Sequence, residues 1–459
     1  MISHLRPYPA YKESGIKWLG KVPEHWATRR LKSVAELIMG QSPLSDDCSP
    51  ETVGLPFLQG CAEFGYMNPK AVQFCSSPPK SSPSGAILMS VRAPVGRLNV
   101  ADQTYGIGRG LCALLPLSGL LRGRFALYQL HVSIHGLATL ATGTTYDAVT
   151  VNDIGILPVW LPSLNEQAAV VHFLDHVDRR IRRYIRAKKK LIKLLEEQKQ
   201  VIIQRAVTRG LDPCVRLRTS GVGWLGDIPD HWDARRNAQL FVQRNENGFA
   251  DLPILEVSLK TGVRIRVFEN SNRKQVMSDR GKYKRAAKGD IAYNMMRMWQ
   301  GAVGVAPVDG LVSPAYVVAR PLNGVEARYY DYLFHTPAYM GEVDNWSRGI
   351  VKDRNRLYWQ DFKQISSPSP PPAEQERIAD YLEARTGLLS SEIISLQREI
   401  FLLREYCTRL IADVVTGKLD VREAAARLPD EAGEPEPIEE EVLPEEVEED
   451  VETTQAVED

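Results

Sequence analysis

Residues 14–26 contain the sequence Ser-Gly-Ile-Lys-Trp-Leu-Gly-Lys-Val-Pro-Glu-His-Trp. It returns at residues 220–232 as Ser-Gly-Val-Gly-Trp-Leu-Gly-Asp-Ile-Pro-Asp-His-Trp, with eight of the thirteen positions identical. A second match lies at the end of each copy, where Val-Thr-Arg-Gly-Leu-Asp at 207–212 is similar to Val-Thr-Gly-Lys-Leu-Asp at 415–420. Since solenoid repeats span only a few tens of residues, this longer period predicts a duplicated domain with its connector.

Each copy ends in a segment with apolar residues at alternating spacings of three and four, which predicts a coiled-coil helix. Pro162 and Pro372 precede the two segments, and Gly210 and Gly417 end them. These apolar positions form the seam through which two helices of a coiled coil pack. Lys188 and Lys199 fall at seam positions of the first helix, and we expect their charged ends to reach the edge of the seam or an acidic side chain. The apolar seam positions, expected to form the coiled coil and dock partners, are Ile181, Ile185, Ile192, Leu195 and Ile202 in the first helix, and Leu389, Ile393, Leu396, Ile400, Leu403 and Leu410 in the second.

The repeats divide the chain into five segments. Short apolar runs bounded by Gly and Pro predict a mixed α/β domain in each of residues 1–161 and 213–370. Long helices are expected within 162–212 and 371–425, and an acidic disordered tail in 426–459. A helix seam about 55 Å long that returns antiparallel would give an α+β dumb-bell with a pseudo-two-fold axis.

The composition is that of an ordinary globular protein, with 44% apolar and 25% charged residues in 459. The N-terminus has no apolar signal region, and no apolar run approaches the roughly 18 residues of a membrane-spanning helix. We therefore expect a cytoplasmic protein without a membrane partner. The six cysteines form no CxxC pair, so neither a zinc site nor a disulfide framework is expected.

The zero net charge hides an asymmetry. Residues 430–459 contain 15 acidic and no basic residues, so residues 1–429 hold 57 basic and 57 − 15 = 42 acidic residues. Such a basic excess on a protein without membrane features indicates a polyanionic partner, most simply nucleic acid. The tail could compete for the basic surface or simply improve solubility.

No catalytic motif is found. The sequence has no P-loop, no Rossmann glycine motif, no HExxH and no Asn-Pro-Pro-aromatic segment. The glycine cluster at 106–110 is interpreted as a turn between strands rather than a phosphate site. We therefore expect no catalytic residue, no metal ligand and no bound cofactor on this chain.

Arginines, amides and aromatics in predicted loops are the candidates for DNA contact. Arg matches the guanine edge, Asn and Gln match adenine, and Lys mainly neutralises phosphate. The candidate residues are Lys80, Arg92, Arg97, Arg109 and Tyr146 in the first domain, and Arg297, Trp299, Gln300, Arg348, Lys352, Arg354 and Asn355 in the second.

Two further features keep alternative interpretations. The basic run at 179–193 is a solvated helix face, a phosphate contact or a docking site for an acidic partner. The repeated stretches 14–26 and 220–232, called the Trp-Leu-Gly blocks below, pack against the start of each domain or bind a common partner, because identical sequences cannot specify two different targets.

The repeated blocks resemble the specificity subunits of type I restriction-modification enzymes. The resemblance is carried by the paired Trp-Leu-Gly-x-x-Pro-x-His-Trp blocks, the Glu-Gln helix starts at 166–167 and 374–375, and the Ala-Val-Thr-x-Gly-Leu-Asp end at 206–212. It spans residues 12 to about 425, and residues 293–301 resemble a recurring second-domain type.

The resemblance implies a non-catalytic subunit whose two target-recognition domains each recognise one half of a split, asymmetric site in double-stranded DNA. It implies that the helices set the spacer and dock two methyltransferase subunits, through which restriction and translocase subunits join. Adenine methylation and ATP-dependent cleavage would then belong to these partners, which bind S-adenosylmethionine, ATP and Mg²⁺.

Two other hypotheses remain open at this point. One is a stand-alone nuclease or methylase with a divergent site. The other is a coiled-coil scaffold whose ends bind RNA or non-specific DNA.

Overall fold

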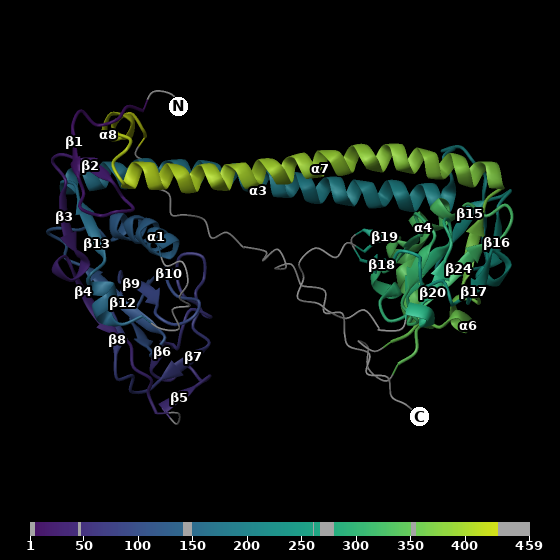
Figure 1. Cartoon of the computed structure of the whole chain (residues 1–459), viewed down its shortest axis with the longest axis horizontal. Helices are drawn as coiled ribbons and strands as arrows, with labels where there is room; N and C mark the ends of the chain where they lie inside the picture. The colour runs from purple at the N-terminus through teal and green to yellow at the C-terminus, as the bar shows by residue number, and fades with distance from the viewer. Residues whose placement is uncertain are drawn as a thin grey trace. The chain divides into compact units, whose positions relative to one another are not determined.

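The computed structural model describes residues 5–44, 47–140, 149–259, 261–266, 280–349 and 355–429. The chain folds into two units, unit 1 of Met1–Arg186 with Ile400–Asp459 and unit 2 of Ala187–Glu399. Two long helices, α3 (Leu164–Arg209) and α7 (Pro372–Val415), contribute to both units (Figure 1). Helix α7 ends at Val415, two residues before Gly417, whose φ is 77°, and a short helix, α8 (Arg422–Ala426), follows.

Helices α3 and α7 pair antiparallel within each unit. In unit 1 the Cys407 thiol donates to the Asp178 carboxylate, Sγ to Oδ1, at 3.9 Å. In unit 2 Lys188 pairs with Glu399, and Lys199 Nζ donates to Ser390 Oγ at 2.9 Å. Both seam lysines therefore meet polar groups of the second helix. Ile181, Leu396, Ile400 and Leu410 are buried, and the other seam residues, Ile185, Ile192, Leu195, Ile202, Leu389, Ile393 and Leu403, are half-buried.

Unit 1 is built around a four-stranded antiparallel sheet in the order β10-β9-β12-β4. Its strands are β4 (Ala35–Met39), β9 (Ile87–Ser90), β10 (Leu98–Val100) and β12 (Leu111–Pro116). A second sheet, in the order β5-β7-β6-β11-β8, contains β5 (Cys48–Ser49), β6 (Leu55–Leu58), β7 (Gln73–Cys75), β8 (Ser81–Ser82) and β11 (Tyr105–Ile107). Unit 1 also contains two strand pairs, β1 (Tyr11–Glu13) with β2 (Lys21–Pro23) and β3 (Ala27–Arg30) with β13 (Pro158–Leu161). Its described helices, besides the long ones, are η1 (Leu31–Ser33), α1 (Gly123–Leu140) and α2 (Val151–Gly155).

Unit 2 contains a four-stranded antiparallel sheet in the order β17-β24-β21-β22. Its strands are β17 (Phe241–Arg244), β21 (Ile291–Asn294), β22 (Val303–Val305) and β24 (Tyr316–Pro321). Four strand pairs surround it: β14 (Leu217–Thr219) with β15 (Asp227–Pro229), β16 (Asp233–Arg236) with β25 (Ser366–Ser369), β18 (Leu255–Ser258) with β19 (Gly262–Ile265), and β20 (Lys284–Ala286) with β23 (Gly310–Val312). The described helices are η3 (Asn237–Gln239), η4 (Arg280–Lys282), η5 (Met298–Gln300), α4 (Ala327–Phe334), α5 (Pro337–Trp346) and α6 (Trp359–Phe362).

The duplication extends through the middles of the two domains, although their sequences diverge there. Leu111 pairs with Ser90 in unit 1 as Tyr316 pairs with Asn294 in unit 2. Before these partners, Gly85 and Gly289 lead into β9 and β21 with positive φ angles of 81° and 89°. The two four-stranded sheets therefore share one register, which lets positions in one domain be equated with positions in the other.

The Trp-Leu-Gly blocks hold the start of each long helix. Trp26 is fully buried, and its indole Nε1 donates to Glu166 Oε1 at 3.1 Å while Tyr8 OH donates to the same oxygen at 2.6 Å. In unit 2 the Trp232 indole donates to Glu374 Oε2 at 3.1 Å. The histidine of each block lies within 2.9 Å of the same glutamate. The repeated sequence thus fastens the first turn of α3 or α7 to its domain.

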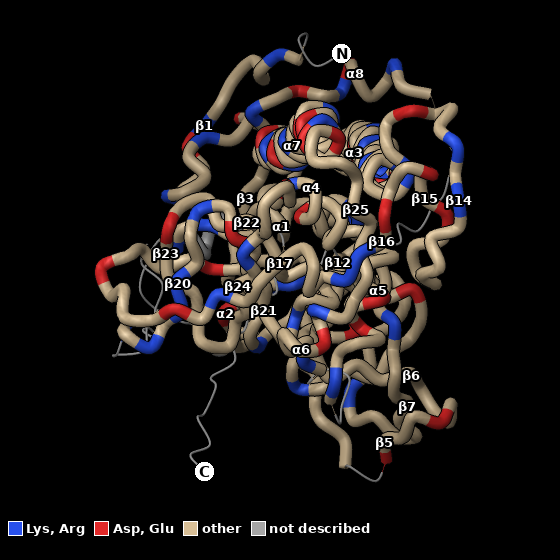
Figure 2. Tube along the Cα trace, turned by 90° about the vertical axis from the view of Figure 1, so that its right-hand side faces the viewer, with Lys and Arg blue, Asp and Glu red and all other residues tan. Residues whose placement is uncertain are grey.

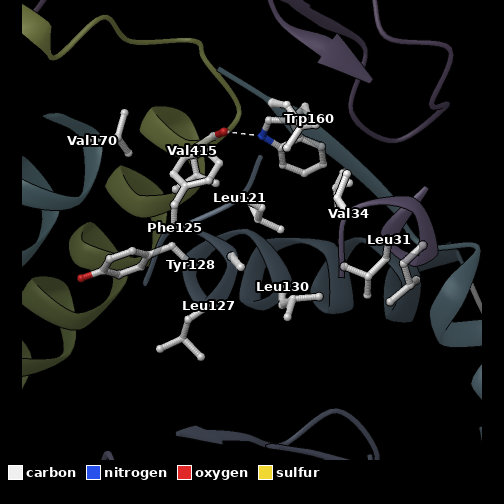
Figure 3. Close-up of a cluster of buried hydrophobic side chains, with 14 of the residues drawn as sticks. Leu31, Val34, Leu121, Phe125, Leu127, Tyr128, Leu130, Trp160, Val170 and Val415 are labelled. Atoms are coloured by element: carbon white, nitrogen blue, oxygen red, sulfur yellow. Dashed lines mark hydrogen bonds between the residues drawn. The ribbon is translucent and has the colours of Figure 1, made fainter. Parts of the chain in front are cut away.

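The same regions hold the end of the other helix. The Trp160 indole donates to the carbonyl of Val415, the last residue of α7, beside the apolar side chains of α1 (Figure 3). In unit 2 Tyr329 OH donates to the Val207 carbonyl near the end of α3 at 2.7 Å. Each domain therefore binds the beginning of one long helix and the end of the other, and the predicted α+β fold class of two mixed domains with two long antiparallel helices is confirmed.

We expect Gly417→Ala to destabilise unit 1 by about 1–3 kcal/mol, because a side chain is strained at its positive φ. A Cβ at this position would also lie 2.4 Å from Pro23 Cδ and 3.0 Å from the Trp26 ring. Urea unfolding followed by circular dichroism measures the effect. Gly119→Ala is the control, since a Cβ there meets nothing within 4 Å. Equal midpoints for the two variants would show that Pro23 and Trp26 do not fix the end of α7.

Candidate nucleic-acid interface

In unit 1 two loops that carry predicted DNA-contact residues lie side by side. Residues 91–97 join β9 to β10, and residues 108–110 join β11 to β12. The Val91 amide donates to the Gly110 carbonyl at 2.9 Å, which fastens the loops together. Arg92 and Arg97 in the first loop and Arg109 in the second are all exposed. The structure therefore brings Arg92 and Arg109, which belong to different strand connections, onto neighbouring loops.

The glycine cluster at 106–110 is a tight turn packed against other loops. A Cβ at Gly108 would lie 2.4 Å from Gln59 Oε1, and one at Gly110 would lie 2.5 Å from the Gln59 carbonyl oxygen. The Gly108 amide donates to the Leu58 carbonyl at 2.8 Å. Close approach to the segment that follows β6 therefore accounts for both glycines.

Three polar residues beside this turn, Gln41, Ser42 and Gln59, were not among the predicted contact residues. The Gln41 amide donates to the Ile107 carbonyl at 3.0 Å, and Gln59 Nε2 donates to Ser42 Oγ at 3.2 Å. Gln41 and Gln59 are exposed. A signal was present in the sequence, since each glutamine adjoins a glycine and follows a predicted apolar run.

The remaining candidates of the first domain are less closely grouped. Lys80 is exposed, and its carbonyl accepts from the Ile107 amide at 3.0 Å, next to the 108–110 turn. Tyr146 lies outside the described residues. The Val149 amide donates to the Val91 carbonyl at 2.9 Å, so the segment that follows Tyr146 passes beside the 91–97 loop.

Unit 2 places its candidates on the corresponding loops. Arg297, Trp299 and Gln300 lie between β21 and β22, where unit 1 has Arg92 and Arg97 between β9 and β10. Gln300 is exposed, whereas Trp299 is half-buried and its indole donates to the Met296 carbonyl at 3.0 Å. The Leu357 amide donates to the Met295 carbonyl at 2.8 Å, as Val149 does to Val91 in unit 1. The two candidate clusters of the second domain are therefore adjacent.

Arg348 has a structural partner. Its backbone exchanges two hydrogen bonds with Arg356, and its Nη2 lies 2.5 Å from Asp361 Oδ1. The Asp361 side chain is only 7% exposed, while that of Arg348 is 75% exposed. Arg348 therefore neutralises a buried carboxylate while most of its side chain faces solvent. Asn355 is half-buried, and Lys352 and Arg354 lie outside the described residues.

Part of the basic run on α3 serves intramolecular contacts. Arg182 Nε donates to Asp178 Oδ2 at 2.6 Å, and its guanidinium lies 4.1 Å from the centre of the Tyr66 ring. Burial raises the pKa of Asp178 to about 6. Arg183, Lys190 and Lys193 are exposed. The run is thus divided between ion pairs that fix the helix and a solvated basic face. Figure 2, which looks along the long helices, shows both acidic and basic residues on α7.

Comparison with known proteins finds a match to part of the chain. A family model described as the type I restriction modification DNA specificity domain matches residues 23–194. Residues 23–194 are therefore similar to a type I specificity domain. The match covers most of the first domain and residues 164–194 of α3, and the shared register shows that residues 213–370 contain a four-stranded sheet of the same arrangement.

Two curated proteins and a solved structure are similar to parts of this chain. A specificity subunit assigned to the type I restriction enzyme MjaX of Methanocaldococcus jannaschii is 36% identical over 197 residues, 41% of this chain and 46% of that protein. The MjaIX specificity subunit of the same organism is 24% identical over 199 residues, 41% of this chain and 44% of that protein. The chain thus spans about half the length of the curated relatives it matches.

A chain from a study of complex assembly and conformational transition in a type I restriction-modification system superposes with a TM-score of 0.65. The two are 18% identical, and the superposition covers 87% of this chain and 99% of the other, which shows a common fold. Among the helices that the structure describes, none is both long and apolar enough to cross a membrane.

We expect Arg348→Met to destabilise unit 2 by about 1–3 kcal/mol, because it leaves the buried Asp361 carboxylate without its cation. Urea unfolding followed by tryptophan fluorescence measures the loss. Arg356→Met is the matched control, since Arg356 shares the same backbone bridge and is exposed. If both variants unfold at the same urea concentration, the ion pair does not stabilise the unit and Arg348 is kept for another purpose.

Proposed function

We propose that this chain is the non-catalytic DNA-recognition subunit of a type I restriction-modification complex, and that each domain recognises one half of a split, asymmetric site. The observation that carries this proposal is one sheet register presenting two different sets of polar loops. Unit 1 places Arg92, Arg97 and Arg109 on these loops, and unit 2 places Arg297 and Gln300 there. Identical scaffolds with different loops can recognise two different sequences.

The residue chemistry of these loops supports contact with double-stranded DNA. Guanidinium groups match the guanine edge and amides match adenine in the major groove, with each good bidentate pair contributing about 1–3 kcal/mol of discrimination. Residues 1–429 hold 57 basic against 42 acidic residues, which favours association with a phosphate backbone.

The two long helices are proposed to set the spacer between the half-sites and to dock two methyltransferase subunits. Support comes from apolar side chains outside the seam that are 42–66% exposed and recur seven residues apart, so each pair lies on one helix face. These pairs are Tyr184 with Leu191 and Leu194 with Val201 on α3, and Tyr381 with Leu388 and Ile394 with Phe401 on α7.

The duplication supports a stoichiometry of two, because each domain repeats the same helix junctions and so offers equivalent docking positions. Restriction and translocase subunits would join through the methyltransferases. We propose that the partners bind S-adenosylmethionine, ATP and Mg²⁺ and carry out methylation and cleavage.

We expect Arg297→Ala to reduce methylation of the cognate site by about 10-fold or more, through loss of a bidentate base contact. Single-molecule methylome sequencing of a host that expresses the chain with its methyltransferase measures the occupancy of the split motif and gives its spacer. Arg216→Ala, at an exposed arginine before β14, is the control and should leave the occupancy unchanged. Co-purification of the methyltransferase should be normal in both variants, and loss of assembly in Arg297→Ala would refute a DNA-contact role.

We expect Leu388→Asp to abolish co-purification of the methyltransferase while leaving the helical circular-dichroism signal unchanged, because Leu388 is 66% exposed and a carboxylate would be desolvated beneath a partner. Val72→Asp, at an apolar residue that is 67% exposed and lies outside the long helices, is the matched control. A Leu388→Asp complex that assembles normally would place the docking surface elsewhere.

A further inference from the structure

We infer that Gln59 determines specificity for adenine in the first half-site, with Arg109 recognising a neighbouring guanine. The inference rests on the proposed function and assigns a base class to one position of it. It arises from loops that the structure brings together, since Gln59 follows β6 and Arg109 follows β11, far apart in the sequence.

Three glycines allow these loops to meet. A Cβ at Gly40 would lie 2.2 Å from the Gly108 carbonyl oxygen, and Cβ atoms at Gly108 and Gly110 would collide with Gln59. The Gly40 amide donates to the Leu111 carbonyl at 2.9 Å, which joins the segment after β4 to the first residue of β12. The segments after β4, β6 and β11 are therefore locked to one another through their backbones. Any side chain at residue 59 projects from a fixed position.

The Gln59 amide is oriented by a neighbour. Its Nε2 donates one hydrogen to Ser42 Oγ at 3.2 Å. Within the described part of the chain, the second hydrogen on Nε2 and the oxygen Oε1 have no hydrogen-bond partner, and Oε1 packs against the Gly108 backbone. A side-chain amide recognises adenine by donating to N7 and accepting from N6, and these two groups are the ones that Gln59 keeps available.

Arg109 supplies the second contact. It lies in the turn whose glycines pack against Gln59, it is exposed, and no carboxylate among the described residues pairs with its guanidinium. This distinguishes it from Arg348, which is paired with a buried aspartate. A guanidinium beside an oriented amide offers donors to guanine O6 and N7 next to the adenine contact.

The second domain cannot make this contact in the same way. The shared register aligns residues 108–110 with residues 313–315, where Gly-Arg-Gly is replaced by Ser-Pro-Ala. Ser-Pro-Ala has no guanidinium, and it lacks the two glycines that let Gln59 approach residues 108 and 110 in the first domain. The pair of Gln59 and Arg109 is thus found in the first domain only. Substitution of either residue is therefore predicted to change base specificity in one half-site only.

Methylome sequencing of a host that expresses the methyltransferase with each variant tests the inference. The wild-type chain gives a split motif, Gln59→Ala relaxes one A·T position of one half-site by about 10-fold or more, and Arg109→Ala relaxes a G·C position of the same half-site. Gln73→Ala, an exposed glutamine on β7, is the control and leaves the motif unchanged. An unchanged motif in Gln59→Ala, or uniform weakening at every position, overturns the inference.

A second measurement avoids any effect of mutation on folding. The wild-type complex is assayed on duplexes in which each adenine of the half-sites is replaced in turn by 7-deazaadenine, which lacks the N7 acceptor. Binding should fall by about 10-fold at one adenine of the first half-site, and Gln59→Ala should lose that sensitivity. Equal binding of all duplexes overturns the inference while the proposed function stands, whereas a wild-type complex that assembles and yields no split motif overturns both.

Discussion

A glutamate at the first turn of each long helix, buried in unit 1 and half-buried in unit 2, makes the interaction on which the rest of the structure depends. Glu166 is 4% exposed and accepts hydrogen bonds from the Tyr8 hydroxyl and the Trp26 indole, with His25 at its second oxygen. A buried carboxylate is costly unless such donors surround it. The helix can therefore begin only where the donors are in place, and this fixes α3 to a segment from the very start of the domain. Glu374 repeats the arrangement for α7.

The features that could be predicted from the sequence are those with a strong local or repeated pattern. The heptad spacing predicted both long helices, and the paired Trp blocks predicted equivalent positions at the start of each domain. Gly417 was expected to end the second helix, and α7 ends at Val415, but the packing of Gly417 against Pro23 and Trp26 could not be predicted. Contacts between opposite ends of the chain leave no periodic signal in a single sequence.

The candidate site was predictable by residue type and only partly by position. Arg92 and Arg297 were chosen from loop composition, and the shared sheet register now places them in the same strand connection of the two domains. Gln59 was missed because its importance comes from neighbours brought in by other strands. The ion pair of Arg348 was missed for a similar reason, since the buried Asp361 belongs to a separate element, α6. Non-local pairing, rather than composition, decides which polar side chains are available to a ligand.

The joining of the chain ends in unit 1 has a consequence for synthesis. Arg6 pairs with Asp420 through the backbone, and Tyr11 OH donates to the Gly417 carbonyl at 3.1 Å. Unit 2 is a continuous stretch from Ala187 to Glu399, whereas unit 1 needs residues from both ends of the chain. On the ribosome the second domain can therefore complete its core first. The first domain, although made earlier, must wait with Trp26 and Trp160 incompletely covered until the last turns of α7 emerge.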